Sequence, residues 1–223
     1  MGFLDRLFGK SRELRPEPPE LDASTAIELF DADGNRFLMS REEYERKVLP
    51  ENFQQHWNDA DALYQLIIGT LRDGFIDACV APAARLSDIH PDRETACVIQ
   101  SIVHVKTGAF ESAISCLEDF IRTNGETGVL VCNLAQAYAA MGDHERARTT
   151  LWNAITLDPN LDTAINWWAA IARETEGDAG FINAMKAIAL LPGSWRADIW
   201  IARDLLTKKK IDSAALIYRR VLS

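Results

Sequence analysis

The stretch GVLVCNLAQAYAAMGDHERARTTLWNAITLDPNL, residues 128–161, has the pattern of two helices joined by a tight turn. Leu134 and Tyr138 are four residues apart and therefore share one face of the first helix. The Gly-Asp pair at 142–143 supplies the turn, and Pro159 ends the second helix because its ring cannot continue the hydrogen-bond ladder. The small residues that let the two helices approach closely are Ala147 and Ala154. The stretch therefore predicts a helical hairpin.

The order of residue types in this hairpin resembles a tetratricopeptide repeat. The positions that carry the resemblance are Leu134, Ala135, Tyr138, Gly142, Ala147, Leu151, Ala154 and Pro159. The resemblance implies an all-α fold, a right-handed superhelix of antiparallel helix pairs whose first helices line a concave groove. It also implies a scaffold that binds other proteins and carries no catalytic residue.

The same features recur at a constant interval along the chain. Glycines expected in turns lie at 74, 108 and 142, each 34 residues apart, and small residues follow at Cys79, Ala113 and Ala147. Gly125 replaces the closing proline of one unit, where it is expected to cap the second helix. We therefore predict repeats over 60–223, divided at 60–93, 94–127, 128–161, 162–194 and 195–223.

The last two repeats depart from the pattern. In the fourth, Gly177 comes late and Gly180 occupies the small position of the second helix. The fifth stops at Ser223 without a closing proline or a polar capping helix. Solenoids need such a cap, so we expect this end to be covered by a partner or a second copy, or to continue in a longer chain.

The first 22 residues divide into two segments. Residues 1–12 place Phe3, Leu4, Leu7 and Phe8 on one helical face, with charged residues opposite. This segment is consistent with a frayed tail, with contact to a membrane surface, or with docking on a protein. Residues 13–22 contain three prolines and several glutamates, which is typical of an extended linker.

Residues 23–59 predict a small extension made of a hairpin and a helix. The two strands are expected at Ile27–Phe30 and Arg36–Met39, around an Asp-Gly turn. Ser40 and Glu43 form a capping box, so a helix should begin there and end before Pro50. An isolated hairpin is marginally stable, and we expect it to pack on the first repeat.

A calcium loop is the alternative interpretation of this turn. The would-be ligands are Asp31, Asp33, Asn35 and Glu42, at loop positions 1, 3, 5 and 12. However, the sixth position, which requires glycine, holds Arg36. A plain turn is therefore favoured.

Composition disfavours several classes of function. The net charge is −9, from 24 basic and 33 acidic residues, which is opposite to the footprint of a nucleic-acid-binding protein. The four histidines and four cysteines show no metal-ligand spacing, and no phosphate loop or nucleophile motif is present. The cysteines form no CxxC pair and are expected to be reduced and packed. We therefore predict no enzyme activity, no cofactor and no metal.

The wider pattern extends the resemblance. It runs from IELFDADGNRFLMSREEYERKVLP through WNDADALY to NLAQAYA, LDPN and LPGSWRA. This pattern resembles a group of bacterial tetratricopeptide proteins with a short N-terminal extension, and the resemblance spans residues 27–222. It implies a cytoplasmic bacterial protein, with peripheral contact to the inner membrane as the alternative.

Mapping the groove-facing repeat positions onto the chain gives a candidate partner-binding site. Its residues are Asn133, Gln136, Asn166, Trp167, Arg173, Trp200 and Arg203. Tryptophan and arginine are the usual anchors of interfaces, and asparagine can hold the main chain of an extended peptide. Trp167 and its neighbour Trp168 cannot face the same side, so one of them is expected in the core. A clamp for a C-terminal carboxylate is disfavoured, because Val98 and Ile102 stand where Lys and Asn would be needed.

The sequence thus predicts a non-catalytic scaffold that binds a peptide or helix in its groove. Two alternatives stay open: an assembly factor tethered to a membrane through residues 3–8, and a module that self-associates through its open C-terminal end. A third interpretation concerns Val98 and Ile102 with Ile99, which would pack against the N-terminal extension rather than line a groove.

Overall fold

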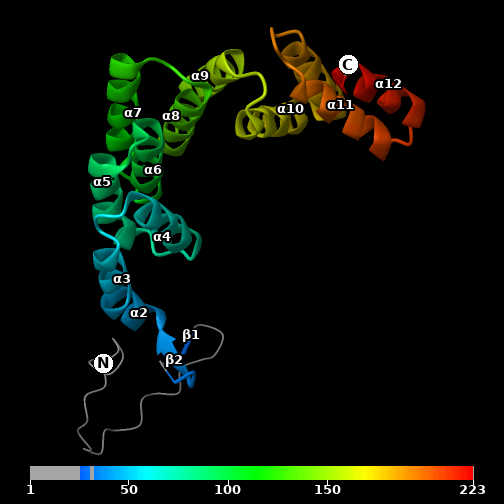
Figure 1. Cartoon of the computed structure of the whole chain (residues 1–223). Coiled ribbons are helices and arrows are strands. Elements are labelled where there is room, and N and C mark those ends of the chain that lie inside the picture. Colours follow the sequence, from blue (N-terminus) through cyan, green and yellow to red (C-terminus); the bar gives the residue numbers. More distant parts are fainter. Residues whose placement is uncertain (1–25, 31–32, 223) are drawn as a thin grey trace, which may run out of the picture. The chain divides into compact units, whose positions relative to one another are not determined.

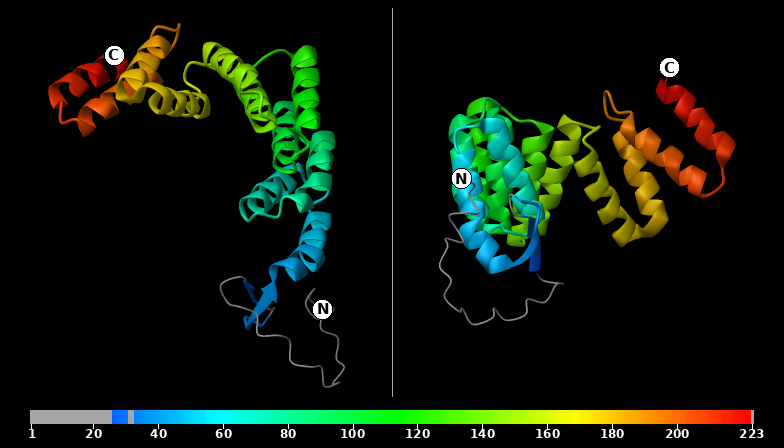
Figure 2. Two further views of the ribbon diagram at one scale, coloured as in Figure 1. Left: turned by 180° about the vertical axis from the view of Figure 1, so that it is seen from behind. Right: turned by 60° about the horizontal axis from the view of Figure 1, so that its bottom comes forward.

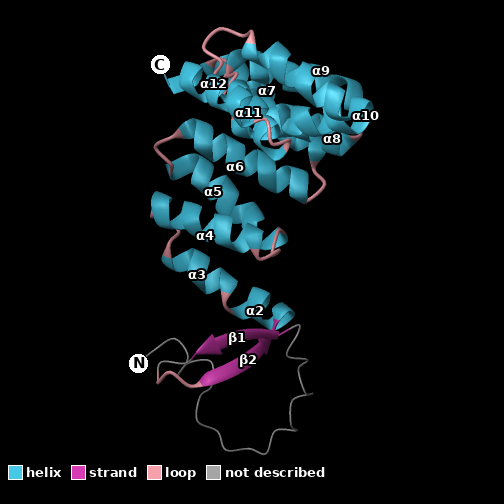
Figure 3. Ribbon diagram, turned by 90° about the vertical axis from the view of Figure 1, so that its right-hand side faces the viewer, coloured by secondary structure: helices cyan, strands magenta, loops and turns pink. Residues whose placement is uncertain are grey.

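A computed structural model describes residues 26–30 and 33–222. The chain forms two compact units, Met1–Ile89 and His90–Ser223, which we describe separately. The predicted fold class is confirmed, since a two-stranded hairpin precedes a series of helices packed in pairs (Figure 1, Figure 3).

The first unit begins with the hairpin and the helix that follows it. Strand β1 (Ala26–Phe30) pairs antiparallel with β2 (Arg36–Ser40). The backbone N–H of Glu43 donates to Ser40 Oγ at 3.1 Å and so caps helix α2 (Arg41–Lys47). The predicted capping residue and the helix end before Pro50 are both observed. A further helix, α3 (Leu49–Gln55), was not predicted; Pro50 lies in its first turn, where the missing N–H costs nothing.

Helix α2 connects this extension to the first helix pair. That pair consists of α4 (Ala60–Arg72), the 3₁₀ turn η1 (Asp77–Cys79) and α5 (Val80–Ile89). The Arg41 guanidinium donates to the Asp73 carbonyl at 2.6 Å and lies 4.1 Å from the ring centroid of Phe75. Tyr44 packs on the same ring, with centroids 5.6 Å apart. The extension therefore contacts the first pair through α2.

The second unit contains seven helices in chain order, each packed on its neighbour (Figure 2). They are α6 (Arg93–Lys106), α7 (Phe110–Asn124), α8 (Gly128–Met141), α9 (His144–Leu157), α10 (Asp162–Ala189), α11 (Arg196–Thr207) and α12 (Ile211–Leu222). Helix α8 also packs directly on α6, so the first helices of two successive pairs are neighbours.

The glycines that set the 34-residue interval lie in the turns. Gly74, Gly108 and Gly142 have φ of +85°, +79° and +93°, a conformation that residues with a Cβ rarely adopt. Gly125 ends α7 with φ +96°, and its N–H donates to the Ile121 carbonyl at 2.8 Å. The turn positions that the glycine pattern predicts are therefore the turns observed in the structure.

In the fourth pair, a kink at one residue takes the place of the turn that joins the two helices of the other pairs. Helix α10 contains both members, and Gly177 (φ 66°, ψ −155°) breaks the helical backbone between them. Gly180 is buried, and a Cβ added there would lie 2.5 Å from the Ala172 carbonyl oxygen. A residue without a side chain is therefore required where the two helices meet.

Two groups of buried side chains hold the second unit together. The larger runs from α8 to α11 and includes Leu151, Ile155, Phe181 and Met185. The smaller lies between α6, α7 and α8, around Cys97, Leu117 and Leu130. Trp167 and Trp168 are both half-buried and both pack against the larger group, whereas the sequence predicts that only one of them belongs to the core.

Candidate functional site

A groove with a volume of about 170 Å³ lies between α6 and α8. Its lining residues are Ser101, Ile102, Val105, Lys106, Asn133 and Gln136. The groove exists because α6 and α8 are the first helices of consecutive pairs and lie side by side. Two of the seven residues predicted from the sequence, Asn133 and Gln136, line it.

The floor of the groove is apolar. Ile102 and Val105 are half-buried there, while Ile99, on the same helix, is buried. The hydroxyl of Ser101 donates to the Val98 carbonyl at 2.8 Å and so is used within α6. An apolar side chain of a ligand would therefore meet Ile102 and Val105 rather than a polar group.

The rim of the groove supplies hydrogen-bonding groups and one charge. Asn133 Nδ2 donates to the Val129 carbonyl of its own helix at 2.9 Å, and its Oδ1 accepts no hydrogen bond from the described residues. Gln136 is exposed, and Lys106 makes no ion pair with any residue in the described part of the chain. The rim can thus accept a backbone N–H at Asn133 and bind a carboxylate at Lys106.

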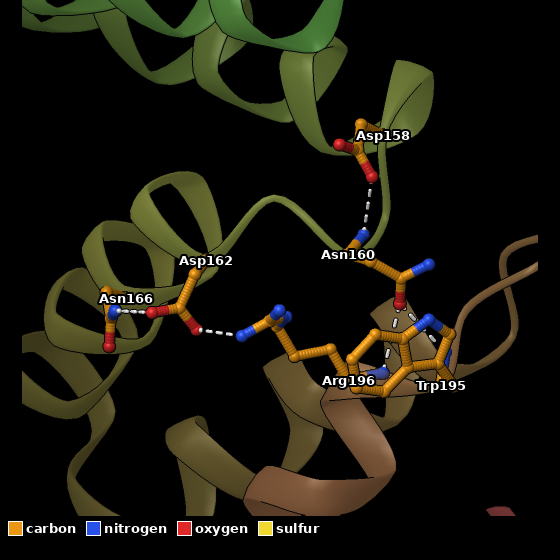
Figure 4. A network of polar contacts seen from close by, with 6 residues as sticks. All are labelled: Asp158, Asn160, Asp162, Asn166, Trp195 and Arg196. Carbon is orange, nitrogen blue, oxygen red and sulfur yellow. Dashed lines mark hydrogen bonds and ion pairs between the residues drawn. The ribbon is translucent and has the colours of Figure 1, made fainter.

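The other five predicted residues lie on α10 and α11, and none lines this groove. Asn166 belongs to a polar network at the start of α10 (Figure 4). Its Nδ2 donates to Asp162 Oδ2 at 3.1 Å, and Asp162 Oδ1 is 2.9 Å from Arg196 Nη1. The Asn166 side chain is therefore partly committed to the contact between α10 and α11.

Arg173 and Trp200 meet at the buried ring of Phe181. The Arg173 guanidinium lies 4.2 Å from the ring centroid, and Arg173 Nε is 3.7 Å from Asp178 Oδ1. The Trp200 ring packs edge-on against Phe181 with centroids 6.5 Å apart. These two side chains thus contribute to packing within the fold. Arg203 is exposed, and Trp167 is half-buried.

Two hollows were not anticipated from the sequence. One, of about 220 Å³, lies between α9 and α10, where Trp152 and Trp168 pack with centroids 5.1 Å apart and Arg148 lies 5.5 Å from the Trp168 ring. It was missed because only first-helix positions were considered, and Trp152 is on a second helix.

The other hollow, of about 460 Å³, lies within the first unit. Its lining includes Leu49, Phe53 and Trp57 from α3 and the residues after it, and Ala81 and Pro82 from α5. The sequence does not predict this hollow, because Pro50 indicates a helix end and α3 lies beyond it. The recurrence of the apolar residues Leu49, Phe53 and Trp57 at intervals of four is the sequence signal that indicates a helix with an apolar face here.

Several sequence-based expectations concern the N-terminal segment, membrane-spanning helices and metal ligands. The apolar residues Phe3, Leu4, Leu7 and Phe8, and the linker 13–22, lie outside the described part of the chain. None of the described helices combines the length and apolar character that crossing a bilayer requires. In residues 26–30 and 33–222, no three His, Cys, Asp or Glu side chains group as metal ligands.

Comparison with known proteins gives one sequence match and several matches in fold. The family profile described as tetratricopeptide repeat matches residues 130–161, within the helical hairpin of residues 128–161. No curated protein matches the chain.

Among solved structures, a thermophilic tetratricopeptide-repeat protein of Thermus thermophilus is 18% identical, with a TM-score of 0.52 over 77% of this chain and 91% of that one. Yeast Tom70 is 16% identical, with a TM-score of 0.51 over 82% of this chain and 39% of that one. A tetratricopeptide repeat protein of Parabacteroides merdae is 11% identical, with a TM-score of 0.50 over 81% and 72% of the two chains. At these identities the likeness concerns the fold alone.

Proposed function

Because the chain carries a tetratricopeptide repeat and has the fold of proteins built from such repeats, we propose that it is a non-catalytic scaffold for protein–protein interaction. We propose further that the groove between α6 and α8 binds a short segment of a partner protein. The groove is the observation that carries this proposal, because it combines an apolar floor with a polar rim on two neighbouring first helices.

The chemistry of the groove defines the segment. Ile102 and Val105 fit one apolar side chain, and Asn133 Oδ1 accepts a backbone N–H of an extended strand. Of the six lining residues only Lys106 is charged, so an acidic side chain close to the apolar one would be favoured. The expected ligand is an extended peptide with an apolar anchor and a nearby carboxylate.

Selection from a displayed library of random peptides tests this proposal. The wild-type chain should enrich peptides of that type, and Asn133→Ala and Ile102→Glu should weaken binding of the enriched peptides by at least about tenfold, or 1.4 kcal/mol. Asn124→Ala is the matched control, because Asn124 Nδ2 makes an equivalent bond, to the Phe120 carbonyl at 3.0 Å, on α7. If the Asn133→Ala and Ile102→Glu variants bind the enriched peptides as tightly as wild type does, the groove is not the binding site.

Self-association is a second candidate function, and one observation favours it. Helix α12 leaves Leu216 and Leu222 67% and 84% exposed. Exposed leucine side chains are a feature of surfaces that bind another protein, and a second copy of the chain is the simplest occupant. Sedimentation at increasing concentration should show a dimer that Leu216→Glu abolishes and Leu190→Glu, at a residue 86% exposed elsewhere, does not. A monomer at all concentrations would exclude it.

Membrane contact through Phe3, Leu4, Leu7 and Phe8 remains a proposal based on the sequence. The amphipathic pattern of residues 3–8, with basic residues beyond it, supports binding to anionic lipid. Co-sedimentation with vesicles containing phosphatidylserine should be lost on deletion of residues 2–10. Equal co-sedimentation of the two proteins would eliminate the tether.

A further inference from the structure

We propose that Cys97 and Cys116 form a dithiol site that a hydroperoxide oxidises reversibly to a disulfide. Cys97 lies on α6 and Cys116 on α7, the two helices of one pair. Their sulfur atoms are 3.6 Å apart, and both thiols are free. A disulfide needs about 2.05 Å, so the two sulfurs must approach by about 1.5 Å, which rotation about the Cα–Cβ bonds and small helix shifts can supply.

The two thiols differ in their access to solvent. Cys116 is half-buried, while Cys97 is 4% exposed and packs with Leu117 and Leu130. The Cys116 thiol also donates to Gln100 Oε1 at 3.8 Å. A small peroxide can therefore reach Cys116, and Cys97 is placed to react only with a sulfur already inside the fold.

The acid–base properties of the two thiols agree with a reaction in which Cys116 reacts first and Cys97 second. The hydrogen bond donated by the Cys97 thiol lowers the pKa of Cys116, although burial and the nearby Asp119 act in the opposite direction. The same hydrogen bond, together with burial, raises the pKa of Cys97. Cys116 is thus the more acidic thiol of the pair and the better nucleophile toward a peroxide.

The reaction balances with the peroxide as the only co-reactant. With hydrogen peroxide as the hydroperoxide, the Cys116 thiolate attacks one oxygen and forms a sulfenic acid, and the hydroxide that leaves takes up a proton to become water. The Cys97 sulfur then attacks the Cys116 sulfur and displaces the hydroxyl group, which leaves as water with the Cys97 proton. Two electrons pass from the two sulfurs to the peroxide, and both protons end in water.

The other two cysteines provide an internal comparison. Cys79 and Cys132 are buried, and burial raises the pKa of both thiols, that of Cys79 to about 12. The sulfur contacts of Cys79 are to the Phe75 and Ile67 carbonyls, and those of Cys132 are to Thr163 and Gln136. Neither thiol meets another sulfur in the described part of the chain, so neither should be cross-linked in the folded protein.

Mass spectrometry of the full, reduced chain tests the proposal. A small molar excess of hydrogen peroxide should remove two hydrogen atoms from the intact mass and link the peptides that contain Cys97 and Cys116. Dithiothreitol should reverse both changes, and the preference for this pair should disappear in denaturant. An unchanged mass, addition of oxygen without a link, or a link to Cys79 or Cys132 would overturn the proposal.

Variants test the order of the two steps. Cys97→Ala should stop oxidation at a Cys116 sulfenic acid that dimedone traps, formed more slowly than in wild type because the hydrogen bond from Cys97 is lost. Cys116→Ala should remove the rapid reaction altogether. Cys132→Ala, which leaves the pair intact, should form the link at the wild-type rate. If Cys97→Ala fails to fold, dimedone trapping during the first moments of wild-type oxidation locates the initial site. Initial trapping on Cys97 instead of Cys116 would contradict the assigned roles.

Discussion

At the scale of single residues, Asn160 joins two segments that are far apart in the sequence. Its Oδ1 accepts hydrogen bonds from the backbone N–H groups of Trp195 and Arg196, at 2.9 and 3.0 Å (Figure 4). Its Nδ2 donates to the Gly193 carbonyl at 2.9 Å. The start of α11 has no side-chain cap of its own. Asn160, in the loop before α10, therefore supplies the hydrogen-bond acceptor for the N–H groups at the start of α11.

We expect Asn160→Ala to lower the free energy of unfolding by about 1–3 kcal/mol, because two backbone donors lose their acceptor. Asn160→Asp keeps the acceptor and loses only the bond to Gly193, so its effect should be smaller. Urea denaturation followed by circular dichroism measures both. An Asn160→Ala variant as stable as wild type would contradict this role.

Gly180 allows a close helix contact that a methyl group would prevent. An added Cβ would lie 2.4 Å from Glu176 Cβ and 2.5 Å from the Ala172 carbonyl oxygen, and the carbonyl cannot move without its helix. We therefore expect Gly180→Ala to destabilise the chain by about 1–3 kcal/mol.

Gly69 is the control for that substitution. It lies inside α4, and nothing surrounds its would-be Cβ within 4 Å. Gly69→Ala should raise stability by about 0.5–1 kcal/mol, because alanine is the better helix former. Thermal denaturation of the two variants should therefore shift in opposite directions, and shifts in the same direction would show that the contact at Gly180 is looser than described.

At the scale of elements, the helix caps give stability a dependence on pH. Asp92 caps α6: the Thr95 hydroxyl donates to Oδ2 at 2.7 Å, and the Thr95 N–H donates to Oδ1 at 3.1 Å. These bonds favour the carboxylate and hold the pKa of Asp92 below its usual value. A lowered pKa in the folded state means that the contribution is present above the unfolded pKa and is lost as pH falls through the folded one.

The unfolded pKa of an aspartate is about 3.9, so wild-type stability should decline below about pH 4. Asp92→Asn keeps a capping oxygen but has no carboxylate to titrate, and its urea midpoint should fall less steeply between pH 5 and pH 2.5. Parallel curves for wild type and Asp92→Asn would refute the assignment.

The elements were largely predictable from the sequence, because their signals are local. Turn glycines require positive φ, and Ser40 with Glu43 marks a helix start whatever the fold around it. Helix α3 was missed because a proline that ends one helix can equally occupy the first turn of the next.

The candidate site was less predictable, because it depends on how the helix pairs stack. Asn133 and Gln136 lie in a repeat of regular spacing, and both line the groove between α6 and α8. Gly177 changes the backbone path in the fourth pair. There the side chains of Arg173 and Trp200 both pack on the ring of Phe181. A mapping that assumes identical repeats cannot anticipate such contacts.

At the scale of the whole molecule, the contacts of the second unit are those of a repeat array. Each helix packs on the next or on the one after it, so stability is distributed along the chain rather than shared by a single core. Helix α8 buries seven residues, whereas α12 buries only Ala214.

We therefore expect local opening to decrease from α12 toward α8. In native-state hydrogen exchange, amides of α12 should exchange at least about tenfold faster than those of α8 at the same pH. The solvent-exposed turns on either side of α8 serve as an unprotected reference. Equal protection of α8 and α12 would indicate that the unit opens as one block, which the helix-by-helix packing argues against.

The placement of Trp57 in the first unit has a practical consequence. The other five tryptophans, at 152, 167, 168, 195 and 200, all belong to the second unit. Subtracting the indole emission of a Trp57→Phe variant from that of wild type isolates the fluorescence of the first unit, and the variant itself reports on the second. The melting of each half can thus be recorded in the intact chain without any attached dye.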